Sequence, residues 1–419
     1  MRLALAAAFI LMTLSAVQAQ PAADRAWLEL TGRGPELRLV TAADHCPEAR
    51  LDGRSVPMRP RAAPSAAFPG AVCTVEVPAG VKSAAVGGWT APLHRDPPQR
   101  ILIFGDTGCR LKGDIVQACN DPRRWPFALV AARAAAQHPD LVIHVGDYYY
   151  RETPCPAGNT GCSGSPFGDN WRTWDAEFFT PAAPLLDGAP WVFVRGNHES
   201  CVRGGAGWFR LLDAAAEVVS CPAESAEFNV DLGDLSLAVL DSANTEDRAA
   251  PKAAVDAFSH QVEEIGAAGG KPVWLLTHRP IWAMVPVAKL GPFGPVGVAI
   301  NTTEQDAVRG HDLAGVQMIV SGHIHHFASY DFGPARPAQL VAGTGGDVGE
   351  DAESTRPRSG TPRIDGLSAE AFSFGQYGYL LLERSGSDWT GVFRDLDDKP
   401  VATCRLHERR LACQRAKGS

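Results

Sequence analysis

Uninterrupted apolar segments recur along the chain after residue 100, and each of them ends in a glycine or a polar residue. A continuous apolar run is typical of a strand that is buried on both faces. The segments with this pattern are Ile101–Gly105, Leu141–Gly146, Trp191–Gly196, Leu235–Asp241, Val273–His278 and Gln317–Gly322. Helix-like sequences lie between several of them, within residues 123–138, 170–179 and 250–269. Strands that alternate with helices predict an α/β layered domain.

Two β-rich segments flank this pattern. Residues 23–95 are rich in proline, glycine and short segments of alternating polarity, which predicts a small antiparallel β domain. The stretch Pro92–Arg100 contains two adjacent prolines and is predicted to be the linker. From Phe374 onward the sequence returns to strand-like runs. We therefore expect a main domain over residues 100–419 that ends in a β-rich C-terminal extension.

The first 19 residues have the pattern of a signal peptide. Arg2 supplies the positive start, Leu3–Val17 is apolar, and small residues end the run at Ala19. The apolar run is shorter than the ~20 residues that a membrane-spanning helix needs, although a retained membrane anchor is the alternative. We expect an exported protein, secreted or periplasmic.

The charge pattern narrows the choice of partners. The net charge is -8. The charged residues are spread along the chain, and no segment is rich in lysine and arginine. Nucleic acids and anionic membranes are bound by clustered basic residues. We therefore expect neither as a principal partner.

Ten cysteines, an even number, predict disulfides in an exported chain. A zinc–thiolate site is the competing interpretation, but the sequence contains no CxxC pair. Pairing each cysteine with its nearest neighbour gives five loops of modest length. The predicted pairs are Cys46–Cys73, Cys109–Cys119, Cys155–Cys162, Cys201–Cys221 and Cys404–Cys413.

Polar residues that can bind metals follow five of the apolar strands directly. Carboxyl ends of strands in an open α/β sheet form the crevice where ligands bind, so these residues are expected to converge on one site. The glycines before them are expected to let the chain turn sharply. Each motif alone has another explanation, such as a helix N-cap or a turn, but chance does not supply all five in this order. The motifs are Gly105–Gly108, Gly146–Tyr150, Gly196–Glu199, Thr277-His278 and Gly322–His325.

Together these motifs follow the patterns GDxG, GDxxY, GNH[DE], a strand that ends in histidine, and GHxH. The set resembles the calcineurin-like metallophosphoesterase superfamily and, within it, the purple acid phosphatases. Thr277–Pro280 and Gly343–Gly346 also resemble this group, and the resemblance extends over about Ile101–Leu382. It implies a layered α-β-β-α metallophosphoesterase domain, here preceded by the small antiparallel β domain.

The resemblance also implies two metal ions. One ion would bind Asp106, Tyr150 and His325, the other would bind Asn197, His278 and His323, and Asp147 would bridge them. A phenolate ligand suits Fe(III), whereas imidazoles with an amide oxygen suit a divalent ion such as iron, zinc or manganese. The alternative for Tyr150 is a place in an aromatic wall of the pocket.

The implied function is hydrolysis of a small-molecule phosphate ester by a metal-activated hydroxide, with His198 as general acid. A structural role for His198, through a hydrogen bond to Asp106 or Asp147, is the alternative. A phosphomonoesterase is the leading hypothesis, and a phosphodiesterase or nucleotide hydrolase on the same metals is the second. A non-catalytic phosphate- or metal-binding protein would have lost a ligand or His198, and none is missing.

One feature departs from the purple acid phosphatases, which often carry a further histidine soon after the strand-ending one. No histidine lies between His278 and His311. Arg279 or Lys289 is a possible replacement for its contact with substrate phosphate.

Overall fold

The computed structural model describes residues 24–418, apart from residues 219, 266–269, 288–295 and 349–356. The predicted signal peptide and Lys289 lie outside the described residues. Among the helices that are described, none combines the length and the apolar composition needed to cross a membrane.

The larger of two main sheets has eleven strands in the order β29-β28-β27-β26-β9-β12-β13-β1-β2-β6-β5. Its central strands β9, β12 and β13 are parallel neighbours, as their continuous apolar sequences predict. The C-terminal strand β26 pairs antiparallel with β9, so the C-terminal extension continues this sheet. The bounds are β1 (Arg25–Thr31), β2 (Gly34–Thr41), β5 (Arg59–Ala62), β6 (Ala71–Glu76), β9 (Arg100–Phe104), β12 (Leu141–His144), β13 (Trp191–Phe193), β26 (Gly378–Ser385), β27 (Asp388–Asp395), β28 (Pro400–His407) and β29 (Arg410–Arg415).

The second main sheet has eight strands in the order β14-β15-β16-β19-β21-β20-β25-β22. Its strands β15, β16, β19 and β21 are parallel, and the strands at its two ends are antiparallel to their neighbours. The bounds are β14 (Phe228–Asp231), β15 (Ser236–Val239), β16 (Val273–Leu276), β19 (Val316–Ser321), β20 (Phe327–Asp331), β21 (Ala338–Ala342), β22 (Arg358–Gly360) and β25 (Glu370–Phe374).

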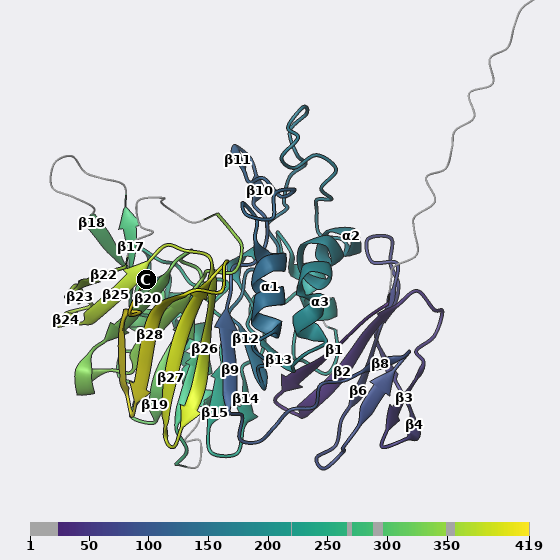
Figure 1. Cartoon of the computed structure of the whole chain (residues 1–419), viewed down its shortest axis with the longest axis horizontal. Coiled ribbons are helices and arrows are strands. Elements are labelled where there is room, and N and C mark those ends of the chain that lie inside the picture. Colours follow the sequence, from purple (N-terminus) through teal and green to yellow (C-terminus); the bar gives the residue numbers. More distant parts are fainter. Residues whose placement is uncertain (1–23, 219, 266–269, 288–295, 349–356, 419) are drawn as a thin grey trace, which may run out of the picture.

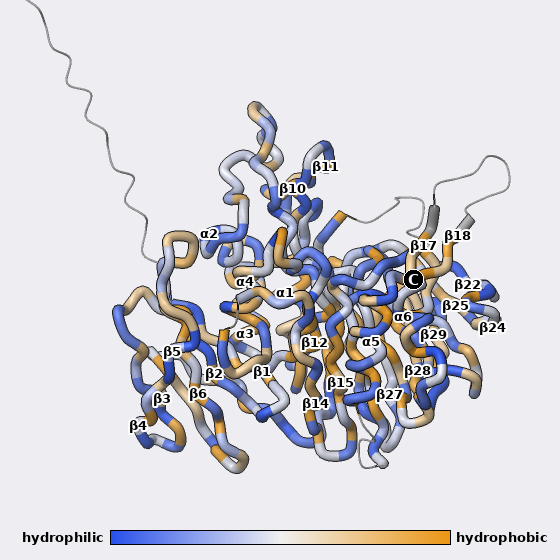
Figure 2. Tube along the Cα trace, turned by 180° about the vertical axis from the view of Figure 1, so that it is seen from behind, coloured by the Kyte–Doolittle hydropathy of each residue, from blue (hydrophilic) through white to orange (hydrophobic). Residues whose placement is uncertain are grey.

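Helices cover the outer face of each sheet. The larger sheet packs against α1 and α3 (Figure 1), and α5 and α6 pack on the smaller sheet, which is seen from behind in Figure 2. The result is the α-β-β-α arrangement that the sequence predicts. The bounds are α1 (Phe127–Ala135), α2 (Trp171–Trp174), a π-helical turn (Asp175–Phe179), α3 (Thr180–Leu186), α4 (Gly205–Leu211), α5 (Lys252–Glu264) and α6 (Thr302–Ala307).

The central strands are apolar throughout because both of their faces are covered. Ile101 and Ile103 on β9 belong to the core between the two sheets, whereas Leu102 and Phe104 belong to the core beneath α1 and α3. Side chains alternate between faces along a strand, so a strand between two covered faces needs apolar residues at every position.

The N-terminal segment is antiparallel, as predicted, and it is joined to the rest of the protein. β1 pairs with β13, so β1, β2, β6 and β5 extend the larger sheet. A four-stranded sheet packs on one face of these strands through a separate apolar core. Its strands are β3 (Glu48–Leu51), β4 (Arg54–Pro57), β7 (Ala84–Val86) and β8 (Trp89–Thr90). Because one sheet runs through both segments, the division into two domains remains a prediction.

Three short hairpins lie outside these sheets, and short 3₁₀ helices span Asn197–Glu199 and Gly333–Ala335. One of the hairpins stands at the top of the view in Figure 1, above the parallel strands of the larger sheet. The hairpins are β10 (Leu111–Lys112) with β11 (Ile115–Val116), β17 (Ala283–Val287) with β18 (Val296–Ile300), and β23 (Arg363–Ile364) with β24 (Leu367–Ser368).

The predicted disulfides are confirmed: all five link sequential cysteines. They are Cys46–Cys73, Cys109–Cys119, Cys155–Cys162, Cys201–Cys221 and Cys404–Cys413.

A buried arginine fixes the N-terminal strands to the main domain. Arg38 on β2 is fully buried and lies 2.6 Å from Glu29 and 2.7 Å from Glu36. It also donates hydrogen bonds to the backbone oxygens of Leu211, the last residue of α4, and of Asp213 just beyond it. The guanidinium therefore satisfies two buried carboxylates and one helix end at once.

We expect Arg38→Met to lower the free energy of unfolding by about 3–5 kcal/mol, because it removes the buried cation that pairs with Glu29 and leaves Glu36 with Arg33 alone. Urea unfolding followed by circular dichroism measures the change. Arg59→Met is the matched control, since Arg59 makes a surface pair with Glu76 in which both side chains are more than half exposed. Equal losses in the two variants would contradict the assigned role of Arg38.

Candidate metal centre

The predicted strand-end ligands come from both main sheets. The larger sheet provides Asp106, Asp147 and Asn197, and the smaller sheet provides His278, His323 and His325. The predicted convergence is present, but it occurs where the carboxyl ends of strands from two facing sheets meet, and not along one sheet edge. The reason is that the chain passes into the second sheet after β13.

One group of donor atoms comes from Asp106, Tyr150 and His325. The hydroxyl of Tyr150 lies 3.1 Å from His325 Nε2 and 3.3 Å from Asp106 Oδ1. His325 Nε2 is 3.4 Å from Asp106 Oδ1. All three side chains are buried.

A second group comes from Asn197, His278 and His323. Asn197 Oδ1 lies 3.1 Å from His278 Nε2 and 3.0 Å from His323 Nδ1. Asp147 belongs to both groups, because its Oδ2 accepts a hydrogen bond of 2.7 Å from the Tyr150 hydroxyl and lies 3.2 Å from His278 Nε2. Ligand atoms of Asp147, His278 and His323 lie within 4.8 Å of one another.

The chemistry of these donors fits two metal ions. Asp106 and Asp147 are almost fully buried, and burying ionised carboxylates is costly unless they are paired or bind a metal. Burial, and then the negative charges of Asp147, Asp347 and Asp106, raise the pKa of Tyr150 well above its ordinary value. A phenolate here at neutral pH therefore requires a strongly charged cation beside it.

The backbone at the site is held in an unusual conformation. Asp106, Asp147 and His323 have φ values of 57°, 61° and 67°, in the left-handed region that side chains other than glycine rarely adopt. Such conformations persist only where the surrounding structure enforces them. The sharp turn that the sequence attributes to the glycines thus occurs mainly at the residues after them.

The glycines before these residues mainly allow close approach. Gly146 does have a positive φ of 98°, but a Cβ atom there would also collide with the ring of His278. A Cβ atom at Gly322 would collide with the carboxylate of Asp106.

Glu199, the last residue of the GNH[DE] motif, holds the loop that carries Asp147. Its fully buried carboxylate accepts hydrogen bonds from four backbone N–H groups. They are those of Asp147 (3.0 Å), Tyr148 (2.8 Å), Tyr149 (3.0 Å) and Gly196 (3.0 Å). The pattern identified this residue, but its role in binding the backbone is visible only in the structure.

His198 lies beside the donor groups. Its ring centroid is 3.8 Å from that of Tyr150, and its backbone N–H donates to Asp147 Oδ1. Its Nδ1 is 2.9 Å from Glu152 Oε1, so the imidazole faces a carboxylate that sequence reasoning missed. Burial lowers the pKa of His198, and the negative charges of Asp147 and Glu152 oppose this effect.

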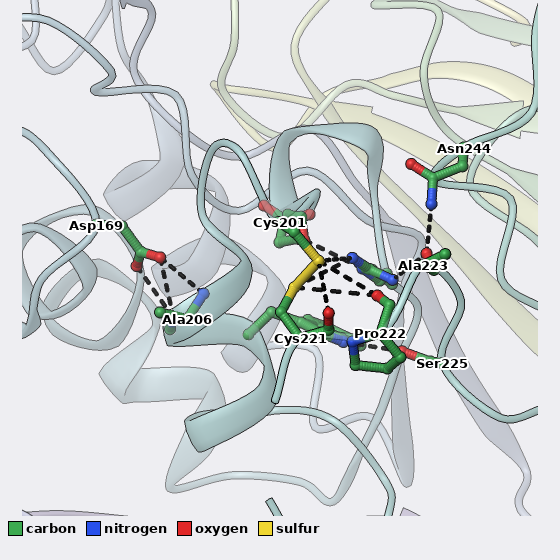
Figure 3. The surroundings of a disulfide bond; sticks show 12 residues. Asp169, Cys201, Ala206, Cys221, Pro222, Ala223, Ser225 and Asn244 are labelled. Carbon is green, nitrogen blue, oxygen red and sulfur yellow. Dashed lines mark hydrogen bonds between the residues drawn. A yellow bond between two sulfur atoms is a disulfide. The ribbon is translucent and has the colours of Figure 1, made fainter. Parts of the chain in front are cut away.

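A disulfide fixes the chain just after His198. Cys201 is bonded to Cys221, and the loop residues Pro222 and Ala223 lie beside this disulfide (Figure 3). Asn244 donates a hydrogen bond to the backbone oxygen of Ala223. The segment that carries His198 is therefore linked covalently to a second loop, which is itself held by the chain beyond β15.

An arginine also points toward the donor atoms. Arg110 pairs with the fully buried carboxylate of Asp347, and its guanidinium carbon lies 4.9 Å from the Tyr150 ring centroid. One of its nitrogens is 3.4 Å from His325 Nε2. Sequence reasoning missed both residues. The only sequence signal for Asp347 was its position directly after the Gly343–Gly346 motif.

These features define a candidate metal-binding site in an α-β-β-α fold, and the comparison with known families gives the class of protein. The sequence profile of the calcineurin-like phosphoesterase family matches residues 99–327, which is more than half of the chain. The chain belongs to this family. Membership implies that the protein is a phosphoester hydrolase. A search of curated protein sequences found no match.

Two solved structures share the fold over most of this chain. The purple acid phosphatase PPD1 from yellow lupin (Lupinus luteus) seeds has a TM-score of 0.59 at 12% identity, covering 94% of this chain and 74% of its own. The structure of PhoD has a TM-score of 0.58 at 11% identity, covering 94% of this chain and 92% of its own. At such low identity, the similarity concerns the fold alone.

We expect Glu152→Gln to lower the pKa of His198 further, because it removes a negative charge that stabilises the imidazolium. An NMR titration of the His198 ring signals, assigned with His198→Ala, measures the shift. Glu263→Gln, at an exposed position of α5, should leave this pKa unchanged. An unchanged pKa in Glu152→Gln would show that the carboxylate does not act on the ring.

Proposed function

We propose that the protein is a phosphomonoesterase, similar in chemistry to purple acid phosphatases, that uses two metal ions. The observation that carries this proposal is the arrangement of two donor groups around Asp147, with a buried histidine beside them. Such an arrangement matches a pair of ions that share one bridging carboxylate.

One ion would be held by Asp106, Tyr150 and His325, and the other by Asn197, His278 and His323. Asp147 would bridge the two. When bound, such a pair acidifies a water molecule and offsets the negative charge of the phosphoryl oxygens. The phenol of Tyr150 favours Fe(III) in the first position, and the neutral donors of the second group favour divalent iron, zinc or manganese.

His198 would protonate the leaving alkoxide. It is buried next to the donor groups, and the carboxylate of Glu152, 2.9 Å from its Nδ1, supports its charged form. A proton donor at this position lowers the barrier most for alcohols that leave poorly as anions.

Arg110 would contact the phosphate of the substrate. Of the two cations considered from the sequence, Arg279 is held in the same way by Asp247, at 2.8 Å, and is the second candidate, whereas Lys289 lies outside the described residues. Arg110 is partly exposed and its orientation is fixed by Asp347. A guanidinium in a fixed orientation is well suited to phosphoryl oxygens.

The proposed location is outside the cytoplasm, secreted or periplasmic. Five disulfides support it, because disulfides persist in oxidising compartments.

The central test combines metal analysis with substrate profiling. We expect two ions per chain, faster hydrolysis of monoesters than of diesters, and loss of activity with loss of metal in Asp147→Ala. A charge-transfer band in the visible spectrum should vanish in Tyr150→Phe. One ion per chain would contradict the dinuclear centre, and faster hydrolysis of diesters would replace the monoesterase with a diesterase.

The role of His198 is tested by its dependence on the leaving group. We expect His198→Ala to slow alkyl phosphate hydrolysis much more than nitrophenyl phosphate hydrolysis, because nitrophenolate needs no proton to leave. Steady-state kinetics at matched metal content measure both. Equal losses for the two substrates would argue for a structural role instead.

A further inference from the structure

The three donor histidines differ in what contacts their outer nitrogen, the ring nitrogen that points away from the other donor atoms. His278 and His325 direct Nε2 toward the other donors, and their Nδ1 atoms lie 2.7 Å and 3.0 Å from backbone oxygens. His323 has the opposite orientation: Nδ1 faces Asn197 Oδ1 at 3.0 Å, and Nε2 faces the carboxylate of Asp247 at 3.0 Å. Only His323, among the three, has an anionic outer partner.

Asp247 is fixed in this position from several sides. Its Oδ1 lies 2.8 Å from Arg279 and 3.3 Å from the side-chain nitrogen of Asn301. Its backbone oxygen accepts hydrogen bonds from the N–H and the hydroxyl of Thr302, both 3.0 Å long. The carboxylate therefore meets His323 in a defined geometry, although its segment is not a helix or a strand.

The same ring nitrogen has a second neighbour with the opposite preference. A nitrogen of Arg279 lies 3.2 Å from His323 Nε2. An arginine can only donate, so it favours a ring with bare Nε2 and protonated Nδ1, whereas Asp247 can only accept and favours a ring with protonated Nε2. Only the second tautomer leaves the Nδ1 lone pair free for a metal.

We propose that Asp247 is a positioning residue that selects the metal-binding tautomer of His323. The inference rests on the proposed function, since it assigns His323 to the second metal ion. Asp247 also adds negative charge behind a donor group that is otherwise neutral apart from the shared Asp147. A carboxylate on the outer nitrogen of a ligating histidine raises its basicity, and its loss typically weakens metal binding by about 10–100-fold.

The test is a zinc titration of the mature full-length protein, stripped of metal, against a competing chromogenic chelator. In the wild type we expect two dissociation constants. Asp247→Ala should raise one of them by about 10–100-fold and leave the other unchanged. Asp247→Asn, which preserves the shape and removes the charge, should raise the same constant by a smaller factor. It also serves as the test if the alanine variant fails to fold.

Asp365→Ala is the matched control, because Asp365 pairs with Arg336 at 2.7 Å with similar exposure but is not in contact with the donor groups. Both constants should be unchanged in this variant. Adding Arg279→Met to Asp247→Ala should restore part of the lost affinity, because it removes the residue that favours the wrong tautomer. A purely structural role for Asp247 predicts no such recovery.

Nitrogen-15 NMR of metal-free protein shows the tautomer of His323 directly. We expect protonated Nε2 in the wild type and a shift toward protonated Nδ1 in Asp247→Ala. Two zinc ions with unchanged constants in Asp247→Ala, or an unchanged tautomer, would overturn this inference and leave the metal centre intact. Fewer than two ions in the wild type would instead refute the proposed function, and this inference with it.

Discussion

The carboxylate of Asp147 is the point on which the site depends. It is buried, it contacts one donor from each group, and its own backbone lies in a left-handed conformation. Burial of a charge in this way is unfavourable unless the surroundings compensate for it. His278 Nε2 and the backbone N–H of His198 face this carboxylate and supply part of that compensation.

The backbone that carries Asp147 and Tyr150 is held by residues that are not among the donor groups. Glu199 gathers four backbone N–H groups around the turn at Asp147. Glu177 does the same for the next part of the loop, accepting from the N–H groups of Cys109 and Tyr150. These two buried carboxylates organise the chain, while Asp106 and Asp147 provide the donors. Acidic residues in this site thus have two distinct roles that look alike in sequence.

Sequence reasoning reached the fold and the donor residues because each leaves a local signal. Continuous apolar runs mark strands covered on both faces, and polar residues directly after them mark the strand ends. The apolar runs alone could not assign each strand to one of two sheets, because sheet membership depends on pairing between distant segments. Nor could it find Asp247 or the contact between Arg110 and Asp347, since isolated charges in irregular segments have no periodicity to identify them.

The order of the disulfides has a consequence for how the protein matures. Every bridge joins a cysteine to the next one along the chain, across separations of 7 to 27 residues. If the chain is exported as proposed, it enters the oxidising compartment from its N-terminus. The first cysteine of each pair then meets its native partner as the next cysteine to arrive. Closing such short loops costs little chain entropy. Oxidation in order of emergence then gives the native connectivity, and the four bridges up to Cys221 can form before the second sheet, which begins at Phe228, has entered the compartment.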